Sequence, residues 1–145
     1  WGYVTLLRGD RALAARRFPP PPGQGWSPYR FGRLGRLFLD LCEDRHDSAR
    51  LLLGDLLKDH QALRAPDGEY TLKLAEAAAL LGERELALDL AGLAATHGFG
   101  CVAWYERSPL LAPLRSAPRY QDLLRNLRQR PADLQRRFPP EAFGL

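Results

Sequence analysis

The feature that most constrains the fold is an alanine-rich stretch at residues 71–99, TLKLAEAAALLGERELALDLAGLAATHGF. Its apolar residues recur with the period of an α-helix both before and after Gly82, which predicts two helices. The faces that would meet carry small side chains at Ala75, Ala78, Ala87, Ala91 and Ala94. Because small side chains let helix axes approach closely, the stretch predicts a tight antiparallel hairpin with its corner at Gly82.

Helical periodicity continues on both sides of this hairpin, and no segment alternates with the period of a β-strand. It predicts helices over residues 29–42 and 49–60, and a final helix that begins near Pro118. Consecutive prolines exclude a helix in residues 19–28 and predict a stiff connector, although PPPP could also serve as a ligand for a proline-binding module. We therefore predict an all-α fold.

A faint repeat runs through the chain. A corner residue is followed five positions later by alanine in three pairs: Gly9 and Ala14, Asp44 and Ala49, and Gly82 and Ala87. The corners are 35 and 38 residues apart, close to the period of about 34 residues of helix-hairpin repeats. The pattern predicts three stacked hairpins.

Two segments resemble the tetratricopeptide repeat (TPR) family. Gly82 and Ala87 match the Gly–x4–Ala core of that repeat, and Leu74 and Ala75 match positions on its first helix. Two positions depart from the family pattern, namely Ala78, where an aromatic residue is usual, and Phe99, where a closing proline is usual.

The second segment is SPLLAPLRSAPRYQDLLRNL, residues 108–127. It is similar to the ending that follows the last repeat in many bacterial signalling proteins, among them serine/threonine kinases, nucleotide cyclases and winged-helix regulators. Ser108 and Ala117 stand where that ending usually has Asp.

The resemblance implies antiparallel helix hairpins stacked as a short TPR-like right-handed solenoid with a C-terminal capping helix. The expected organisation is a partial first hairpin (1–18), a Pro/Gly-rich connector (19–28), a TPR-like helical domain with its capping helix (29–130) and a tail (131–145). The implied function is non-catalytic: a protein–protein interaction or regulatory scaffold module of a larger bacterial signalling protein. Its partner would be another protein or another domain of the same polypeptide.

In such a solenoid the first helices of the hairpins form the concave binding face. The residues expected on that face are Arg33, Arg36, Asp40, Lys73 and Glu76. Trp104 and Tyr105 could anchor a partner, because aromatic residues dominate interface energetics. They could equally plug the open end of the last hairpin, and we favour the plug.

Composition narrows the partner class. The net charge of +4 comes almost entirely from arginines that are scattered among acids from Arg8 to Arg137, so we expect no nucleic-acid partner. No apolar run is long enough to span a bilayer, and we expect no membrane partner. Two cysteines without a CxxC motif fit a reduced cytoplasm. Because the chain begins at Trp1 and contains no methionine, we expect it to be part of a longer protein.

Three alternatives remain open. Cys42 with His46, and His97 with Cys101, have spacings that could bind a metal, and Cys42, His46 and Asp47 could form a nucleophilic site. We favour a buried thiol and a capping imidazole instead, and expect no catalytic residue, metal or cofactor. Acids around residues 40–47 are expected to cap a helix. A stand-alone inhibitor of the immunity or antitoxin type would also bind a protein.

Overall fold

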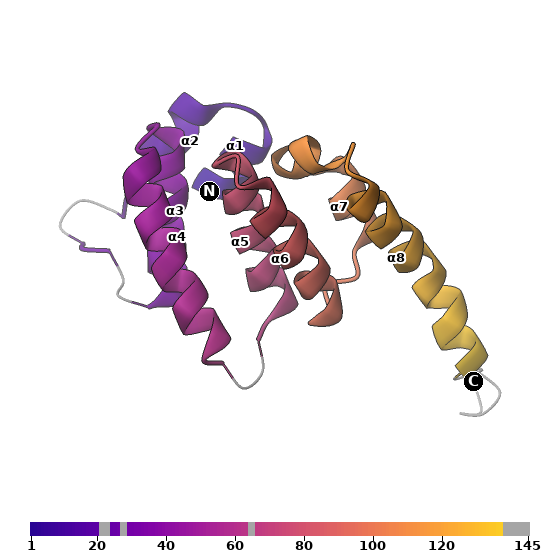
Figure 1. Cartoon of the computed structure of the whole chain (residues 1–145). Coiled ribbons are helices and arrows are strands. Elements are labelled where there is room, and N and C mark those ends of the chain that lie inside the picture. The colour runs from indigo at the N-terminus through magenta and orange to yellow at the C-terminus, as the bar shows by residue number, and fades with distance from the viewer. Residues whose placement is uncertain (21–23, 27–28, 64–65, 138–145) are drawn as a thin grey trace.

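The computed structural model describes residues 1–20, 24–26, 29–63 and 66–137, and within these ranges every regular element is a helix. In chain order the helices are α1 (Gly2–Leu7), α2 (Arg11–Arg17), α3 (Arg30–Cys42), α4 (His46–Gln61), α5 (Gly68–Leu80), α6 (Arg84–Thr96), α7 (Val102–Arg107), the 3-10 helix η1 (Pro109–Leu114) and α8 (Pro118–Arg137). The α3–α4 and α5–α6 hairpins lie side by side, α1 and α2 lie at the top of the view, and the C-terminal helices follow beyond α6 (Figure 1).

The three expected corners share one backbone conformation. Gly9, Asp44 and Gly82 have φ values of +83°, +56° and +77°, and Asp44 is the one non-glycine residue with positive φ in the described part of the chain. The alanine five positions after each corner, at Ala14, Ala49 and Ala87, has no exposed surface. The repeated pattern thus marks three turns that reverse the chain, each followed by a helix with a buried alanine.

The α5–α6 hairpin is the most closely packed pair and lies at the centre of the core. All five alanines expected at its interface are buried. The first residue of α5, Gly68, touches the end of α6: a Cβ atom there would lie 2.7 Å from the nitrogen of Phe99 and 2.8 Å from the oxygen of Ala94. Only glycine allows this approach without a shift of the backbone.

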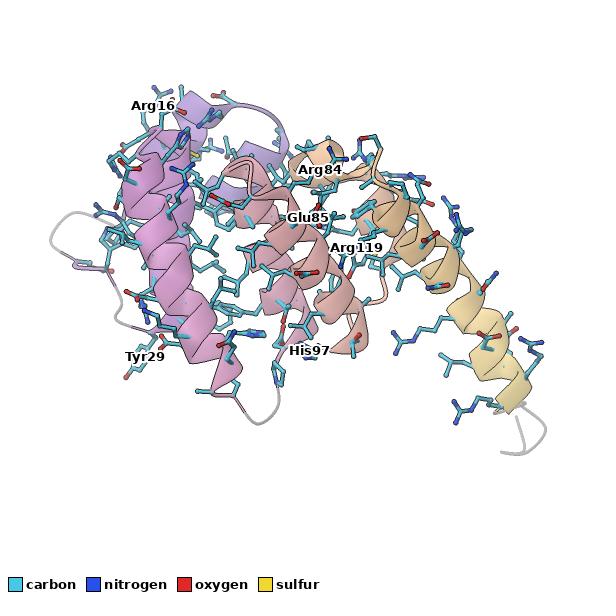
Figure 2. All side chains as sticks on the ribbon, viewed as in Figure 1. Arg16, Tyr29, Arg84, Glu85, His97 and Arg119 are labelled. Carbon is cyan, nitrogen blue, oxygen red and sulfur yellow. The ribbon has the colours of Figure 1, made fainter. Side chains whose placement is uncertain are left out.

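The C-terminal helices close the far side of this hairpin. Tyr105 on α7 and Tyr120 on α8 have no exposed surface, and the Tyr120 hydroxyl donates a 2.9 Å hydrogen bond to the Tyr105 carbonyl. On the outer surface Arg119 pairs with Glu85 and Asp89 of α6 (Figure 2). The beginning of α8 therefore covers the end of the row, while the end of α8 extends away from it (Figure 1).

The all-α expectation is confirmed for the residues that the structure describes. Between the central hairpin and α8, α7 and η1 form short helices that the periodicity did not predict. Helix α8 continues through the boundary expected between residues 130 and 131 and ends at Arg137, and the rest of the predicted tail, residues 138–145, lies outside the described residues. So do residues 21–23 and 27–28 of the predicted connector. Among the helices described, none is long and apolar enough to cross a membrane.

Candidate functional site

A buried carboxylate connects the N-terminal hairpin, the central hairpin and α7. Glu76 on α5 has no exposed surface. Its Oε1 accepts hydrogen bonds of 2.9 Å from Trp104 Nε1 and from Ser108 Oγ, and its Oε2 accepts one from the Tyr3 hydroxyl. Since a buried carboxylate is costly unless it is hydrogen-bonded, these three donors are what allow Glu76 to occupy the core.

Lys73 places its ammonium group beside this carboxylate. The Nζ atom lies 3.8 Å from Oε2 of Glu76, 4.2 Å from the ring centroid of Tyr3 and 4.6 Å from that of Trp104. Burial lowers the pKa of Lys73, and the charges of Glu76 and Glu69 offset part of that shift. The cation between two aromatic rings, here called the lysine stack, holds α1, α5 and α7 together.

One pocket opens on the α3 side of the lysine stack, and we call it the α3–α5 pocket. It has a volume of about 360 Å3. It is lined by Tyr3, Phe18, Phe31, Leu34, Gly35, Phe38, Asp67, Glu69, Tyr70 and Lys73. Five of these residues are aromatic, and Phe31 is 65% exposed. Its charges are engaged within the fold: Asp67 caps α5 through the Tyr70 nitrogen, and Glu69 lies 3.9 Å from Lys73.

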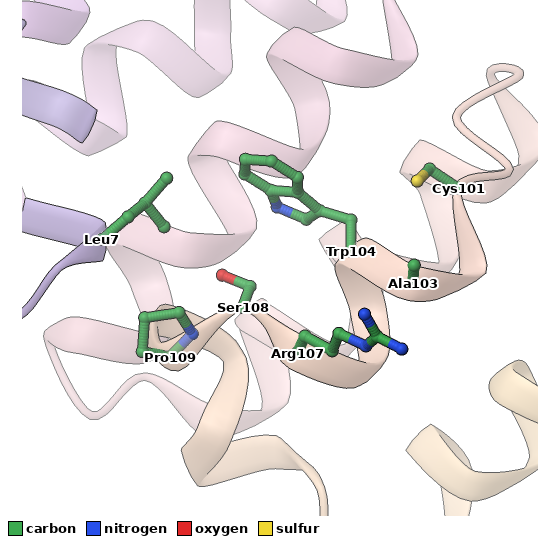
Figure 3. Close-up of a pocket in the computed structure, with 7 residues that line it drawn as sticks. All are labelled: Leu7, Cys101, Ala103, Trp104, Arg107, Ser108 and Pro109. Carbon is green, nitrogen blue, oxygen red and sulfur yellow. The ribbon is translucent and has the colours of Figure 1, made fainter.

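A second pocket shares Trp104 with the lysine stack, and we call it the α7 pocket (Figure 3). It has a volume of about 310 Å3. It is lined by Leu7, Cys101, Ala103, Trp104, Arg107, Ser108 and Pro109. Trp104 therefore contributes both to the lysine stack and to a pocket wall, while its neighbour Tyr105 points into the core and bonds the carbonyls of Ala91 and Phe99. Of these two adjacent aromatic residues, Trp104 thus lines a pocket and Tyr105 is buried in the core.

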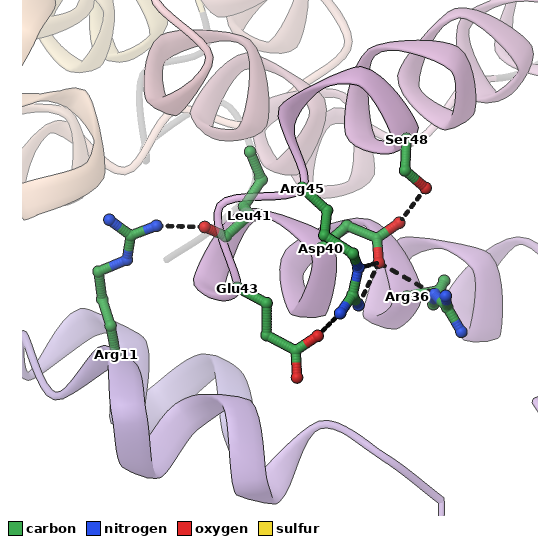
Figure 4. Close-up of polar contacts among 7 residues, drawn as sticks. All are labelled: Arg11, Arg36, Asp40, Leu41, Glu43, Arg45 and Ser48. Atoms are coloured by element: carbon green, nitrogen blue, oxygen red, sulfur yellow. Dashed lines mark hydrogen bonds and ion pairs between the residues drawn. The ribbon is translucent and has the colours of Figure 1, made fainter.

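The expected site residue Asp40 is also buried, at 1% exposure. Its carboxylate accepts a 2.7 Å hydrogen bond from Ser48 and bonds of 2.9 and 3.1 Å from Arg45 and Arg36 (Figure 4). Burial alone would raise the pKa of Asp40, but these hydrogen bonds and charges lower it below its ordinary value. Asp40 thus joins the end of α3 to the start of α4 and offers no free carboxylate to a partner.

The remaining expected residues lie on α3. The Arg33 side chain is 31% exposed and pairs with Asp59 of α4, and the Arg36 side chain is 45% exposed beside Asp40. The structure thus brings Lys73, Glu76 and Trp104 together, whereas Arg36 pairs with Asp40 and Arg33 pairs with Asp59, apart from that cluster. Neither Arg33 nor Arg36 lines the α3–α5 pocket.

Two structural elements of this region were not predicted from the sequence. Tyr3 lies 73 residues before Glu76, and nothing in its local pattern places it there. A histidine pair forms the second: the His60 and His97 rings are 5.7 Å apart, and both bond the Thr71 hydroxyl, at 2.7 and 3.3 Å. Because that hydroxyl donates to the Asp67 carbonyl, it accepts from both imidazoles.

The two Cys/His pairs do not meet. Cys42 is buried, and burial raises the pKa of its thiol, whereas Cys101 is exposed. His46 lies 3.6 Å from Asp44, and His97 faces His60. In the part of the chain that the structure describes, no three His, Cys, Asp or Glu side chains are close enough together to hold a metal ion.

The site thus consists of two pockets that each share residues with the lysine stack. Comparisons of the chain with protein-family models, curated proteins and solved structures find no match.

Proposed function

We propose that the chain is a non-catalytic protein–protein interaction module whose binding surface is the face formed by α1, α3, α5 and α7. One observation carries this proposal. The helical residues that line the two pockets belong to these four helices and to η1, and none lies within α2, α4, α6 or α8. One helix of each hairpin therefore contributes to the same surface.

A TPR-like solenoid carries the first helix of each hairpin on its inner face, and the shared surface of α1, α3 and α5 supports the proposal in this respect. The three corners with positive φ and the capping position of α8 support the same interpretation. The wider proposal is a cytoplasmic regulatory scaffold within a larger bacterial signalling protein, which binds another protein or another domain of its own polypeptide. The resemblance of residues 108–127 to the ending of such arrays supports it.

The aromatic lining of the α3–α5 pocket supports a role in binding a partner, in addition to its role in packing. Phe31 and Tyr70 form an edge-to-face pair with ring centroids 5.8 Å apart, and Arg30 lies over both rings. Phe31 nevertheless keeps 65% of its surface exposed. Exposed aromatic residues beside a pocket are typical of the anchors that dominate protein interfaces.

The test is affinity capture from an extract of the source organism with matched variants. Phe31→Ala removes an exposed aromatic side chain at the pocket. Leu51→Ala is the control, because it removes an apolar side chain of comparable exposure, 76%, from α4. We expect Phe31→Ala to lose a partner that the native chain and Leu51→Ala both retain. Equal capture by all three chains, with their helical circular dichroism unchanged, would contradict the proposed surface.

A further inference from the structure

Arg107 is an uncompensated cation at the edge of an apolar pocket. It is exposed, and it forms no hydrogen bond or ion pair with any residue that the structure describes. It is also the one charged residue in the lining of the α7 pocket, whose other walls include Leu7, Trp104 and Pro109 (Figure 3). A ligand that fills this pocket therefore meets an apolar wall and one free guanidinium group.

The carboxylate behind the wall of the α7 pocket is already paired with other groups. Glu76 accepts hydrogen bonds from the pocket residues Trp104 and Ser108, and Lys73 and three hydrogen bonds already compensate its charge. Arg115 adds a further cation, since its Nη2 donates to the Ser108 carbonyl at 2.7 Å and its buried Nε has no partner. No carboxylate lines the α7 pocket, so its electrostatic potential favours an anion.

The α3–α5 pocket differs in this respect. Its two carboxylates and its lysine are engaged with each other or with the backbone, as described above. The α7 pocket is therefore the part of the binding face that distinguishes partners by charge.

We propose that the α7 pocket binds an acidic–apolar segment of a partner protein, in which a large apolar side chain lies next to Asp or Glu. The apolar side chain contacts Trp104, Leu7 and Pro109, and the carboxylate pairs with Arg107. A planar guanidinium group suits this role because it can bind a carboxylate through two parallel hydrogen bonds. This inference rests on the proposed function and adds the chemical class of the partner.

The test uses an array of short synthetic peptides that carry Leu, Phe or Trp next to Asp or Glu. A matched array has Asn or Gln in place of each acid. We expect the native chain to bind acidic members about fivefold more tightly than their amide counterparts, the range of a favourable exposed ion pair. Arg107→Gln should abolish this preference, and Arg16→Gln should preserve it. Arg16 is a suitable control because it is an exposed arginine without a described partner on α2, away from α7 (Figure 2).

Ala103→Trp provides an independent variant. Ala103 is exposed and lines the pocket, so a larger side chain fills the space without removing a described contact. We expect it to block both peptide classes. Equal binding of acidic and amide peptides, a preference that survives Arg107→Gln, or no binding below about 1 mM would overturn the inference. The proposed function fails separately, if partner capture survives Phe31→Ala.

Discussion

The indole Nε1 of Trp104 donates a 2.9 Å hydrogen bond to Oε1 of Glu76, a carboxylate with no exposed surface. This bond joins α7 to the central hairpin, and the Tyr3 hydroxyl joins α1 to the same carboxylate. The proposed binding face thus depends on a buried polar cluster, which holds α1, α5 and α7 together beside the two pockets. Its residues are the first targets for mutation.

Replacing the central carboxylate should destabilise the fold strongly. Glu76→Ala leaves Lys73 and the buried Ser108 hydroxyl without their anionic partner. We expect a loss of about 3–5 kcal/mol in the free energy of unfolding, measured with urea. Glu69→Ala is the control, because Glu69 is mostly exposed and 3.9 Å from the same lysine, and it should cost less than about 1 kcal/mol. A Glu76→Ala loss below about 1 kcal/mol would show that the cluster is not structural.

The corner between α5 and α6 should require glycine. Gly82 has a φ of +77°, in a region that strains an L-amino acid, so Gly82→Ala should lower the free energy of unfolding by about 1–2 kcal/mol. Gly92→Ala is the matched control within α6, where φ is not positive and an added Cβ meets nothing within 4 Å. That variant should gain about 0.5–1 kcal/mol, because alanine is the better helix former. Thermal unfolding of both variants measures the contrast, and shifts of the same sign would contradict it.

The buried carboxylate of Asp40, between α3 and α4, should contribute more to stability than the exposed acids around it. Asp40→Ala removes the acceptor of Ser48 and of two arginines, and we expect it to cost about 1–3 kcal/mol in urea unfolding. Asp47→Ala removes a fully exposed carboxylate from the first turn of the same helix and should lower the free energy of unfolding much less than Asp40→Ala does. Equal losses would show that the acids of residues 40–47 act only as helix caps.

The histidine pair should make stability depend on pH. Burial, the neighbouring His97 and the charge of Arg30 lower the pKa of His60 below its ordinary value of 6.5. A lowered pKa means that the folded chain disfavours the charged imidazole. The stabilising contribution is therefore complete above about pH 6.5 and is lost as the pH falls from there through the folded pKa.

Urea unfolding between pH 8 and pH 5 measures this effect, with a slope of up to about 1.4 kcal/mol per pH unit below pH 6.5. His60→Gln should remove most of that slope, while His46→Gln, at an exposed position, should leave it unchanged. Asp40 contributes in a separate window, because its lowered pKa makes its stabilisation fade only below its ordinary pKa of 3.8. A slope that survives His60→Gln would contradict the assignment to the pair.

The hairpins could be predicted because their signals are local. Gly9, Asp44 and Gly82 mark the corners within a few residues of the helices that they separate, and the buried alanines follow at a fixed spacing. Gly68 was not predicted, since its contact with Phe99 depends on how two helix ends meet in space. Residues close together in the sequence thus indicate where each helix begins and ends. The close contacts between helices depend on the three-dimensional packing and cannot be predicted in this way.

The site was predicted only in part. The expected concave face included Lys73 and Glu76, but the sequence could not show that Tyr3 and Trp104 would cover them. A glutamate within an Ala/Leu-rich helix is itself a signal of a buried polar partner, because such a helix is apolar on most sides. Arg107 carried no signal, since its lack of a partner emerges only from the positions of all neighbouring acids.

Photo-crosslinking in the source organism tests the central claim, that the face of α1, α3, α5 and α7 binds a protein. Benzoylphenylalanine would replace the exposed residues Phe31 and Ala103 on that face, and Leu51 and Leu93 on α4 and α6. We predict that Phe31 and Ala103 crosslink to the same protein, or to the same domain of the native polypeptide, and that Leu51 and Leu93 do not. Crosslinks from Leu51 and Leu93 alone, or equally from all four positions, would contradict the account.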